Sequence, residues 1–460
     1  MRPILVMATT GIALCIGASH ALAAGQVARD QLLAQAPDST RALSLNVHRD
    51  GDSDIALEIQ PMQVFTQDAE LIIVGADGKQ EHAALPNTRY FRVQGTQMNG
   101  ILAIPDNGEE FGLIQDNAGF QQLKFGGDGS LRLHAIDTSS GAARSFQCEN
   151  DQSIGDMERS QASNADEPRV APSSALAAPY TARIAIETDN EYLARFSGNT
   201  ITATNYVGSL IGFISTIYDA EVQTNMQVSF LRLWASPDPF VQTKPACLML
   251  ESGKYWNDNQ AATSRTTMHF LSGKTTTAGI AWIGVLCSGP FTATLVQVGE
   301  TTTTCPGLSD SANYGGGYGT TEGISGNFNA ANPSVIWDVD SVAHEIGHNF
   351  NSPHTHCYNN IGGNASPIDQ CSNSGNGCYA GATSLPGPQG VGSGTIMSYC
   401  HLLPGGFSNT TLTFGTGHPY GVAPERVPSR MFAHVQQRAS SSPSCLARIN
   451  VDLIFKNGFD

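Results

Sequence analysis

Three histidines and one glutamate stand close together in residues 342–354, which read VAHEIGHNFNSPH. On a helix, His344 and His348 lie one turn apart and share a face, so both imidazoles can bind one metal ion. Glu345 projects beside that face, within reach of a water molecule in an open coordination position, and can take its proton. With only 12 His in 460 residues, H-E-x-x-H arises by chance in roughly one chain in a hundred. The segment predicts a catalytic zinc site with Glu345 as general base, not as a ligand.

A third ligand at His354 requires the helix to end soon after His348. Asn349 and Asn351 tolerate left-handed backbone better than other non-glycine residues, and Pro353 cannot extend a helix that needs its amide. We therefore expect the chain to turn back, so that His354 reaches the metal from the opposite side. The predicted cofactor is one zinc ion per chain, bound by the three histidines.

The spacing resembles the signature of the metzincin zinc peptidases, H-E-x-x-H-x-x-G-x-x-H followed later by a methionine turn. Asn351 stands where that family usually has Gly. Asparagine is the next-best residue for a positive φ angle, so we expect a cost of about 1 kcal/mol and an intact site. The segment GTIMSY at 394–399 resembles the methionine turn, with Met397 as an apolar floor beneath the histidines. The alternative for Met397 is an ordinary core methionine.

Among metzincins the chain resembles the reprolysins (adamalysins), which usually carry Asp after the third histidine and Cys before the Ile-Met of the turn. Thr355 and Thr395 hold those positions here. The Met-Ser-Tyr order is instead similar to astacins and serralysins, in which the tyrosine can reach the zinc. Tyr399 is thus a candidate fifth ligand or transition-state stabiliser, with plain packing as an equal alternative. The reprolysin resemblance also implies a disulfide between Cys287 and Cys445.

Length, composition and charge limit the possible domain organisation, targeting and partners of the chain. At 460 residues it is too long for one compact domain, and 40% hydrophobic residues are typical of a globular protein. Residues 1–24 combine Arg2, a short apolar run and Ala-Leu-Ala at 21–23, which predicts a signal peptide. No later stretch reaches about 18 uninterrupted apolar residues, so we expect a secreted chain without a membrane anchor. A net charge of −16 argues against nucleic acid as a partner.

Residues 25–150 contain short runs with strand-like alternation, separated by glycine and asparagine, which predicts a β-rich domain. The order of its parts is similar to the propeptide of reprolysin-type metzincins. Residues 151–178 are rich in Asp, Glu, Ser, Ala and Pro, which predicts a linker accessible to proteolysis. The expected strands of the β-rich domain are 42–47, 55–59, 69–74, 90–93, 100–104, 111–114 and 131–135.

Residues 179–450 have the rhythm of an α/β (α+β) catalytic domain, for which the resemblance implies a mixed sheet and a zinc-binding helix. The run 279–287 is similar to the reprolysin strand that borders the substrate cleft. Glycines 315–317 are expected in a flexible surface loop, and 451–460 form a short tail. We expect strands at 181–187, 227–234, 267–271 and 279–287, and helices at 189–196, 203–218, 335–350 and 428–439.

Eight cysteines follow the linker, enough for four disulfides in an exported protein. Four of them flank the histidine motif and could indicate a second metal, but their spacing does not fit paired C-x₂₋₄-C zinc ligands, which favours disulfides. His356 and His401 are expected at the rim of the site and not as ligands. The eight are Cys247, Cys287, Cys305, Cys357, Cys371, Cys378, Cys400 and Cys445.

Cys148 is left over once Cys15 departs with the signal peptide. It stands at the end of the β-rich domain, just before the linker, and a thiolate is a strong fourth ligand for zinc. In a zymogen its sulfur could take the position that water needs, as in the cysteine switch of several metzincin propeptides. The alternatives are a free or mispaired thiol, or an intermolecular bridge.

The predicted function is a secreted zinc endopeptidase, made as a zymogen, that acts on protein or peptide substrates. The alternatives are a zinc hydrolase of small amides and a non-catalytic adhesin with structural zinc. Glu345 argues against the adhesin, because a closed structural site needs a fourth protein ligand and no general base. A structural Ca²⁺ is allowed without a motif to place it, and no pattern indicates the oligomeric state or the preferred cleavage site.

Overall fold

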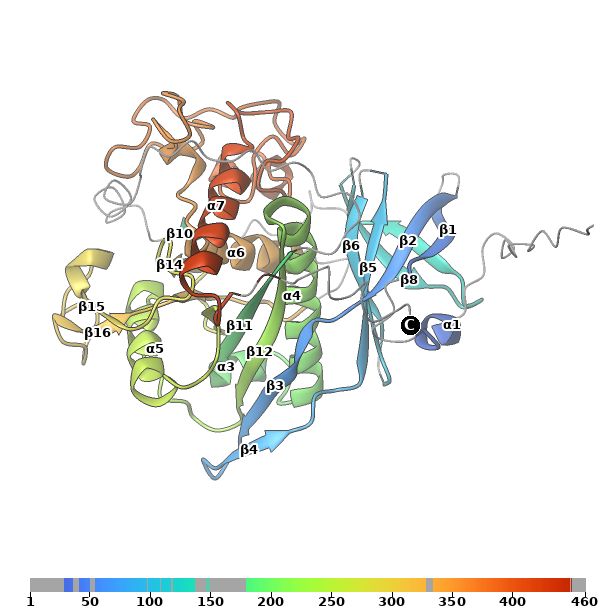
Figure 1. The fold of residues 1–460 in the computed structure, drawn as a ribbon, viewed down its shortest axis with the longest axis horizontal. Coiled ribbons are helices and arrows are strands. Elements are labelled where there is room, and N and C mark those ends of the chain that lie inside the picture. Colours follow the sequence, from blue (N-terminus) through green and yellow to red (C-terminus); the bar gives the residue numbers. More distant parts are fainter. Residues whose placement is uncertain are drawn as a thin grey trace, which may run out of the picture.

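The computed structural model describes residues 29–35, 41–49, 54–96, 98–107, 109–116, 119–136, 147–148, 179–327, 334–446 and 448. Figure 1 shows a barrel, in blue and cyan, beside a larger body of sheet and helices, in green to red except for a blue hairpin at the edge of its sheet. The predicted signal peptide, linker and tail lie outside the described residues, and the domain boundaries stay predictions. Within the described ranges, no helix is long and apolar enough to span a membrane.

The barrel closes in the order β1-β2-β5-β6-β7-β8-β9. Its strands pair antiparallel with their neighbours, except that β1 and β9 close the ring in parallel. Alternate side chains such as Leu57, Phe91 and Leu102 fill its interior. Six of the seven expected runs are barrel strands, and β8 was missed because two glutamines interrupt its apolar alternation. The strands are β1 (Leu43–Arg49), β2 (Ile55–Met62), β5 (Thr88–Gly95), β6 (Met98–Pro105), β7 (Phe111–Asp116), β8 (Gly119–Phe125) and β9 (Leu131–Ala135), with α1 (Arg29–Leu33) nearby.

The larger body is built on an eight-stranded mixed sheet of order β10-β14-β17-β13-β11-β12-β3-β4. Only the β14–β17 and β3–β4 pairs are antiparallel. The seventh expected run of the N-terminal region is therefore β3, a strand of this sheet and not of the barrel. The strands are β3 (Phe65–Val74), β4 (Gln80–Ala83), β10 (Gln147–Cys148), β11 (Tyr180–Thr188), β12 (Thr224–Trp234), β13 (Thr267–Leu271), β14 (Ala278–Ala281) and β17 (Tyr318–Thr321).

Helices cover both faces of the sheet (Figure 1). In β11, Ile184 and Ile186 point to a core shared with α4, α6 and α7, while Ala185 points to a core shared with α5. Asp189 caps α3 as expected, because its carboxylate accepts the Tyr192 amide at 2.7 Å. The expected helices are present, and α5 was missed. The helices are α3 (Asn190–Ala194), α4 (Thr200–Val222), α5 (Pro245–Asn259), α6 (Ser334–Asn349) and α7 (Arg426–Ser441).

Two expectations about local structure were wrong. The run 279–287 is a strand only as β14, because the Gly284 and Val285 amides turn to donate to the carbonyls of His348 and Asn349 at 2.9 and 3.1 Å. Glycines 315–317 are buried between β16 (Ser311–Gly315), which pairs with β15 (Phe291–Thr294), and β17, not in a surface loop. A Cβ at Gly315 would lie 2.0 Å from the Phe291 ring, so close packing explains that glycine.

The cysteine expectation is confirmed. All eight cysteines after the linker form disulfides, including Cys287–Cys445, which ties the turn after β14 to the end of α7. The other three are Cys247–Cys305, Cys357–Cys378 and Cys371–Cys400. Four disulfides are typical of proteins that fold in an oxidising compartment.

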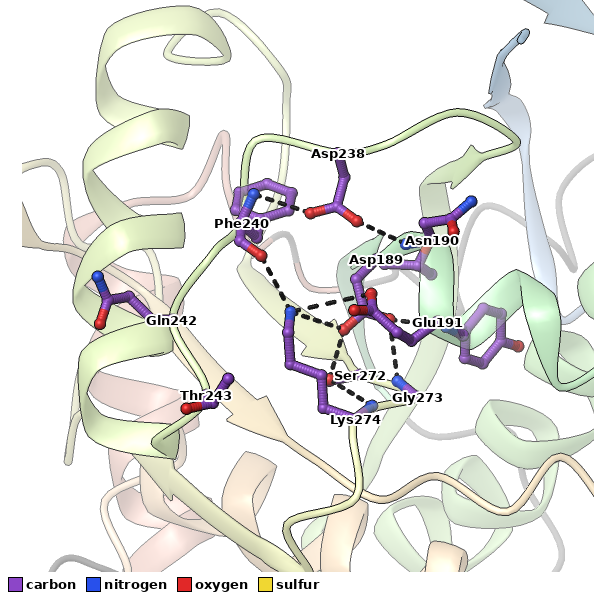
Figure 2. Close-up of polar contacts among 12 residues, drawn as sticks. Asp189, Asn190, Glu191, Asp238, Phe240, Gln242, Thr243, Ser272, Gly273 and Lys274 are labelled. Atoms are coloured by element: carbon purple, nitrogen blue, oxygen red, sulfur yellow. Dashed lines mark hydrogen bonds and ion pairs between the residues drawn. The ribbon is translucent and has the colours of Figure 1, made fainter.

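A buried lysine joins the loops at the carboxyl ends of three parallel strands (Figure 2). Lys274 Nζ, after β13, lies 3.3 Å from the Asp189 carboxylate, after β11, and donates to the Phe240 carbonyl, after β12, at 3.0 Å. The side chain of Asp189 is fully buried and that of Lys274 is 9% exposed. Burial also raises the pKa of neighbouring Asp238. Lys274 thus supplies a positive charge to this acidic cluster. The structural Ca²⁺ that the sequence allowed elsewhere stays a prediction.

Candidate metal centre

The end of α6 turns the chain back as the sequence predicts. The Asn351 and Ser352 amides donate to the carbonyls of His348 and Gly347 at 2.8 and 3.1 Å, which closes the last helical turn. Asn351 has φ = 78°, the left-handed conformation expected at the family's glycine position. Arg430 of α7 donates to the Asn351 carbonyl at 2.6 Å. The turn is therefore held from both sides, and the chain after it leads back to His354.

Three imidazoles converge beyond this turn. His354 Nε2 lies 3.1 Å from His344 Nε2 and 3.2 Å from His348 Nε2, and all three side chains are buried. His344 Nδ1 lies 2.7 Å from the Ile396 carbonyl, and His348 Nδ1 lies 2.7 Å from the Ser352 carbonyl. A carbonyl only accepts, so each Nδ1 carries the proton and each Nε2 presents its lone pair. The lone pairs of His344 Nε2 and His348 Nε2 thus face His354 Nε2. A proton on His354 Nε2 can form a hydrogen bond to only one of them, whereas a divalent cation can bind all three nitrogen atoms.

Cys148 completes the group. Its Sγ lies 3.6 Å from His348 Nε2, and the four ligand atoms of Cys148, His344, His348 and His354 all lie within 4.8 Å of one another. Tetrahedral zinc with bonds of about 2.1 Å to nitrogen and about 2.3 Å to sulfur separates its ligand atoms by about 3.4 to 3.6 Å. The donors therefore fit zinc in both type and spacing.

Burial keeps the histidines neutral, the form in which imidazole binds metal. It lowers the pKa of His348 to about 4, and it holds the pKa values of His344 and His354 well below the ordinary histidine value, with neighbouring histidines adding to the shift.

The predicted methionine turn packs directly against α6. A Cβ at Gly347 would lie 2.6 Å from Met397 Sδ, so the glycine lets the fully buried methionine reach the helix. Thr355, at the position where reprolysins usually have Asp, donates its amide and its hydroxyl to the Met397 carbonyl at 3.0 and 3.2 Å. Together with the bond from His344 to Ile396, these contacts fix two of the histidines to one turn.

Glu345 lies against the edge of the sheet. Its side chain is fully buried, and a Cβ at Gly279 of β14 would lie 2.5 Å from Glu345 Oε1. Only glycine at 279 leaves room for the carboxylate beside the strand. Sequence reasoning included Gly279 in a strand without seeing this role; a glycine inside an apolar strand pattern is the signal that could have found it.

Comparison with known proteins agrees with this geometry. The family model Reprolysin_5, described as metallo-peptidase family M12, matches residues 178–405. The chain belongs to the reprolysin-like metzincins. It is therefore a metallopeptidase of a family that uses a metal, usually zinc. No curated protein matches the chain.

Two solved structures are similar to this metzincin. One is metalloproteinase-II from Bacteroides fragilis, at 10% identity and a TM-score of 0.30, with 71% of this chain and 85% of that chain covered. The other is a chaperone–substrate complex, at 10% identity and a TM-score of 0.25, with 66% of this chain and 33% of that chain covered.

Three further side chains line the metzincin site. The Tyr399 hydroxyl donates to the Cys148 carbonyl at 3.0 Å, and its ring centroid lies 4.5 Å from that of His354. His356 stacks on His354 at 5.5 Å and lies 3.1 Å from the Ser374 carbonyl, while His401 stacks on Phe407 at 5.3 Å. Both histidines, predicted at the rim of the site, are buried, and neither belongs to the group of four ligand atoms that Cys148 forms with His344, His348 and His354.

Proposed function

We propose that this metzincin is a secreted zinc endopeptidase made as a zymogen. The observation that carries the proposal is the convergence of three histidine Nε2 atoms, two of them with the tautomer set by backbone carbonyls. His344, His348 and His354 would hold the metal. Secretion is supported by the four disulfides, which require an oxidising compartment to persist.

The chemistry of the chain's own groups follows from their positions. When bound, zinc supplies a Lewis acid that lowers the pKa of water and polarises a carbonyl. Glu345 takes the proton of the attacking water and later gives it to the leaving amine. Tyr399 is placed to donate its hydroxyl to a carbonyl oxygen, since it already does so to that of Cys148. Met397 supports the histidines from below.

A polypeptide substrate fits better than a small amide. Residues Gln147 and Cys148 form β10, which pairs with Ala278 and Gly279 of β14 beside Glu345. The edge of β14 thus accepts an extended backbone by strand addition, a mode in which main-chain hydrogen bonds supply affinity for any peptide. A small amide would leave those edge groups unused.

Latency would come from Cys148. Its sulfur lies where a fourth zinc ligand belongs, and β10 covers the edge that a substrate would use. Cleavage in residues 151–178 is the proposed first step of activation.

The test compares processed protein with its Glu345→Gln variant. We expect the wild type to hydrolyse casein, to lose this activity with a chelator, and to regain it with zinc. Glu345→Gln should keep about one zinc per chain while losing activity at least about a hundredfold, the effect of removing a general base. Glu191→Gln, on a half-exposed side chain of α3, is the matched control and should change neither. A Glu345→Gln variant with more than a tenth of wild-type activity would sink the assignment.

A further inference from the structure

The N-terminal region supplies a strand to the catalytic sheet. β3 pairs in parallel with β12 from Leu71 beside Leu231 to Val74 beside Trp234, and β4 forms the outer edge (Figure 1). Ile72 and Val74 lie in one core of the larger body, while Val64 and Leu71 lie in the other. Without β3, strand β12 would become an exposed edge with a row of unpaired backbone groups and uncovered apolar side chains.

The barrel also fits one face of α4, residue by residue. Gly208 and Gly212 lie one turn apart on that face, and a Cβ there would lie 2.1 Å from the Tyr90 hydroxyl or 2.3 Å from Ile101 Cδ1. Each glycine costs a helix about 1 kcal/mol relative to alanine, so two on one face indicate that close approach is required.

Polar pairs frame these glycines along the same face of α4. Thr88 donates to Asn205 at 2.7 Å, and Asn99 donates to Thr216 at 2.9 Å. Arg92 forms an ion pair with Asp219. The Arg92 side chain is 18% exposed and the Asp219 side chain is 3% exposed. Farther away, the Leu412 amide donates to Gln115 of the barrel at 2.9 Å. The contact surface thus combines polar and apolar side chains and extends along α4 from Asn205 to Asp219.

β10, which carries Cys148, is a much shorter contact. It is a two-residue strand that pairs with β14 and accepts a hydrogen bond from the Tyr399 hydroxyl, and Cys148 approaches His348 and packs in one cluster with Trp337 and Cys400. Cutting the linker breaks the covalent path between the barrel and β11, but it removes no contact of β3 with β12 or of the barrel with α4. Loss of latency and loss of the barrel are therefore separate events.

We infer that the barrel, with β3 and β4, stays bound after the linker is cut, as a noncovalent subunit of a two-chain enzyme. The surface formed by β12 and by the face of α4 from Asn205 to Asp219 is its permanent docking site. This inference rests on the proposed zymogen, but it concerns assembly and not catalysis.

The experiment uses full-length protein with a recognition site for a specific protease inserted in residues 151–178. The Glu345→Gln background prevents self-digestion, so the result does not depend on the proposed activity. After complete cleavage, both fragments should co-elute from size exclusion in a 1:1 ratio at micromolar concentration. Release of the barrel would overturn the inference, whether the C-terminal fragment stays soluble or precipitates.

Two further measurements locate the interface. Arg92→Ala should speed dissociation of the cut protein at least tenfold, whereas Arg132→Ala should not, because Arg132 pairs with Asp128 inside its own hairpin. If Arg92→Ala fails to fold, hydrogen exchange on the protein with the wild-type Arg92 tests the inference instead. Amides of residues 228–234 should be equally protected before and after the cut, and loss of that protection would contradict retention.

Discussion

Single residues decide whether the third histidine can face the other two. Asn351 takes the positive φ that the turn needs, and its carbonyl is held by Arg430. Thr355 binds the Met397 carbonyl through both its amide and its hydroxyl, so the absence of the family's usual Asp leaves the turn anchored. At both departures from the motif, Asn351 and Thr355, other atoms of this chain hold the turn in place.

Cys148 is the residue whose replacement tests latency. Cys148→Ala removes the sulfur that lies 3.6 Å from His348 Nε2, so the uncut variant should hydrolyse peptides at no less than about a tenth of the rate of the processed enzyme. The uncut wild type should be inactive, and its thiol should react only after a chelator removes the metal.

Gln147→Ala is the control for the latency test, because it alters the same short strand but keeps the sulfur. It should leave the uncut protein latent. A latent Cys148→Ala protein would mean that β10 blocks the cleft by its backbone alone.

At the scale of elements, sequence patterns predicted the helices and strands that local apolar spacing determines. The helix of the histidine motif, its end soon after His348 and most strands follow from apolar spacing and from residues that stop helices. The partner of each strand does not follow from period. The alternation of β3 fits a barrel as well as the sheet it joins, and β14 ends early because its successors bind the end of α6. Such long-range contacts also hid the role of Gly279.

The loops after β11, β12 and β13 should depend on Lys274. Lys274→Met leaves the buried carboxylate of Asp189 without its cation, and breaking a buried pair in this way costs about 3 kcal/mol. The melting temperature should fall by several degrees. Lys254→Met is the control, because Lys254 pairs with Asp258 on the exposed side of α5 and such pairs contribute about 0 to 1 kcal/mol. Equal melting temperatures for the two variants would contradict the role of Lys274.

At the scale of the whole molecule, the N-terminal region holds the catalytic sheet at both edges. β10 lies at one end of the strand order, and β3 with β4 lies at the other. The first edge borders the histidine cluster, and at the second edge Phe65 of β3 lies against Gly208 of α4 and Tyr90 of the barrel. If the proposed zymogen is right, activation requires release of β10 only, while β3 and β4 remain paired with the sheet.

Acid should destabilise the protein through buried histidines that are not among the predicted metal ligands. Burial lowers the pKa of His269 in β13 and of His434 in α7 to about 3, against an ordinary value of 6.5. Between pH 6.5 and about 3 the unfolded chain binds protons that the folded chain refuses, so the free energy of unfolding falls as pH falls. Each group contributes up to about 1.4 kcal/mol per pH unit in that window and nothing above it.

Replacing His269 should reduce this pH dependence. His269 Nε2 lies 2.9 Å from the Thr321 hydroxyl, a contact that the amide of His269→Gln can reproduce without titrating. Melting temperatures of metal-free Glu345→Gln protein at pH 7.5 and 4.5 provide the measurement, since removing the metal excludes its release as a cause. His82→Gln, on the exposed hairpin strand β4, is the control and should melt with the same pH dependence as its parent. If His269→Gln loses as much stability as the control on acidification, then His269 does not contribute to the pH dependence of stability.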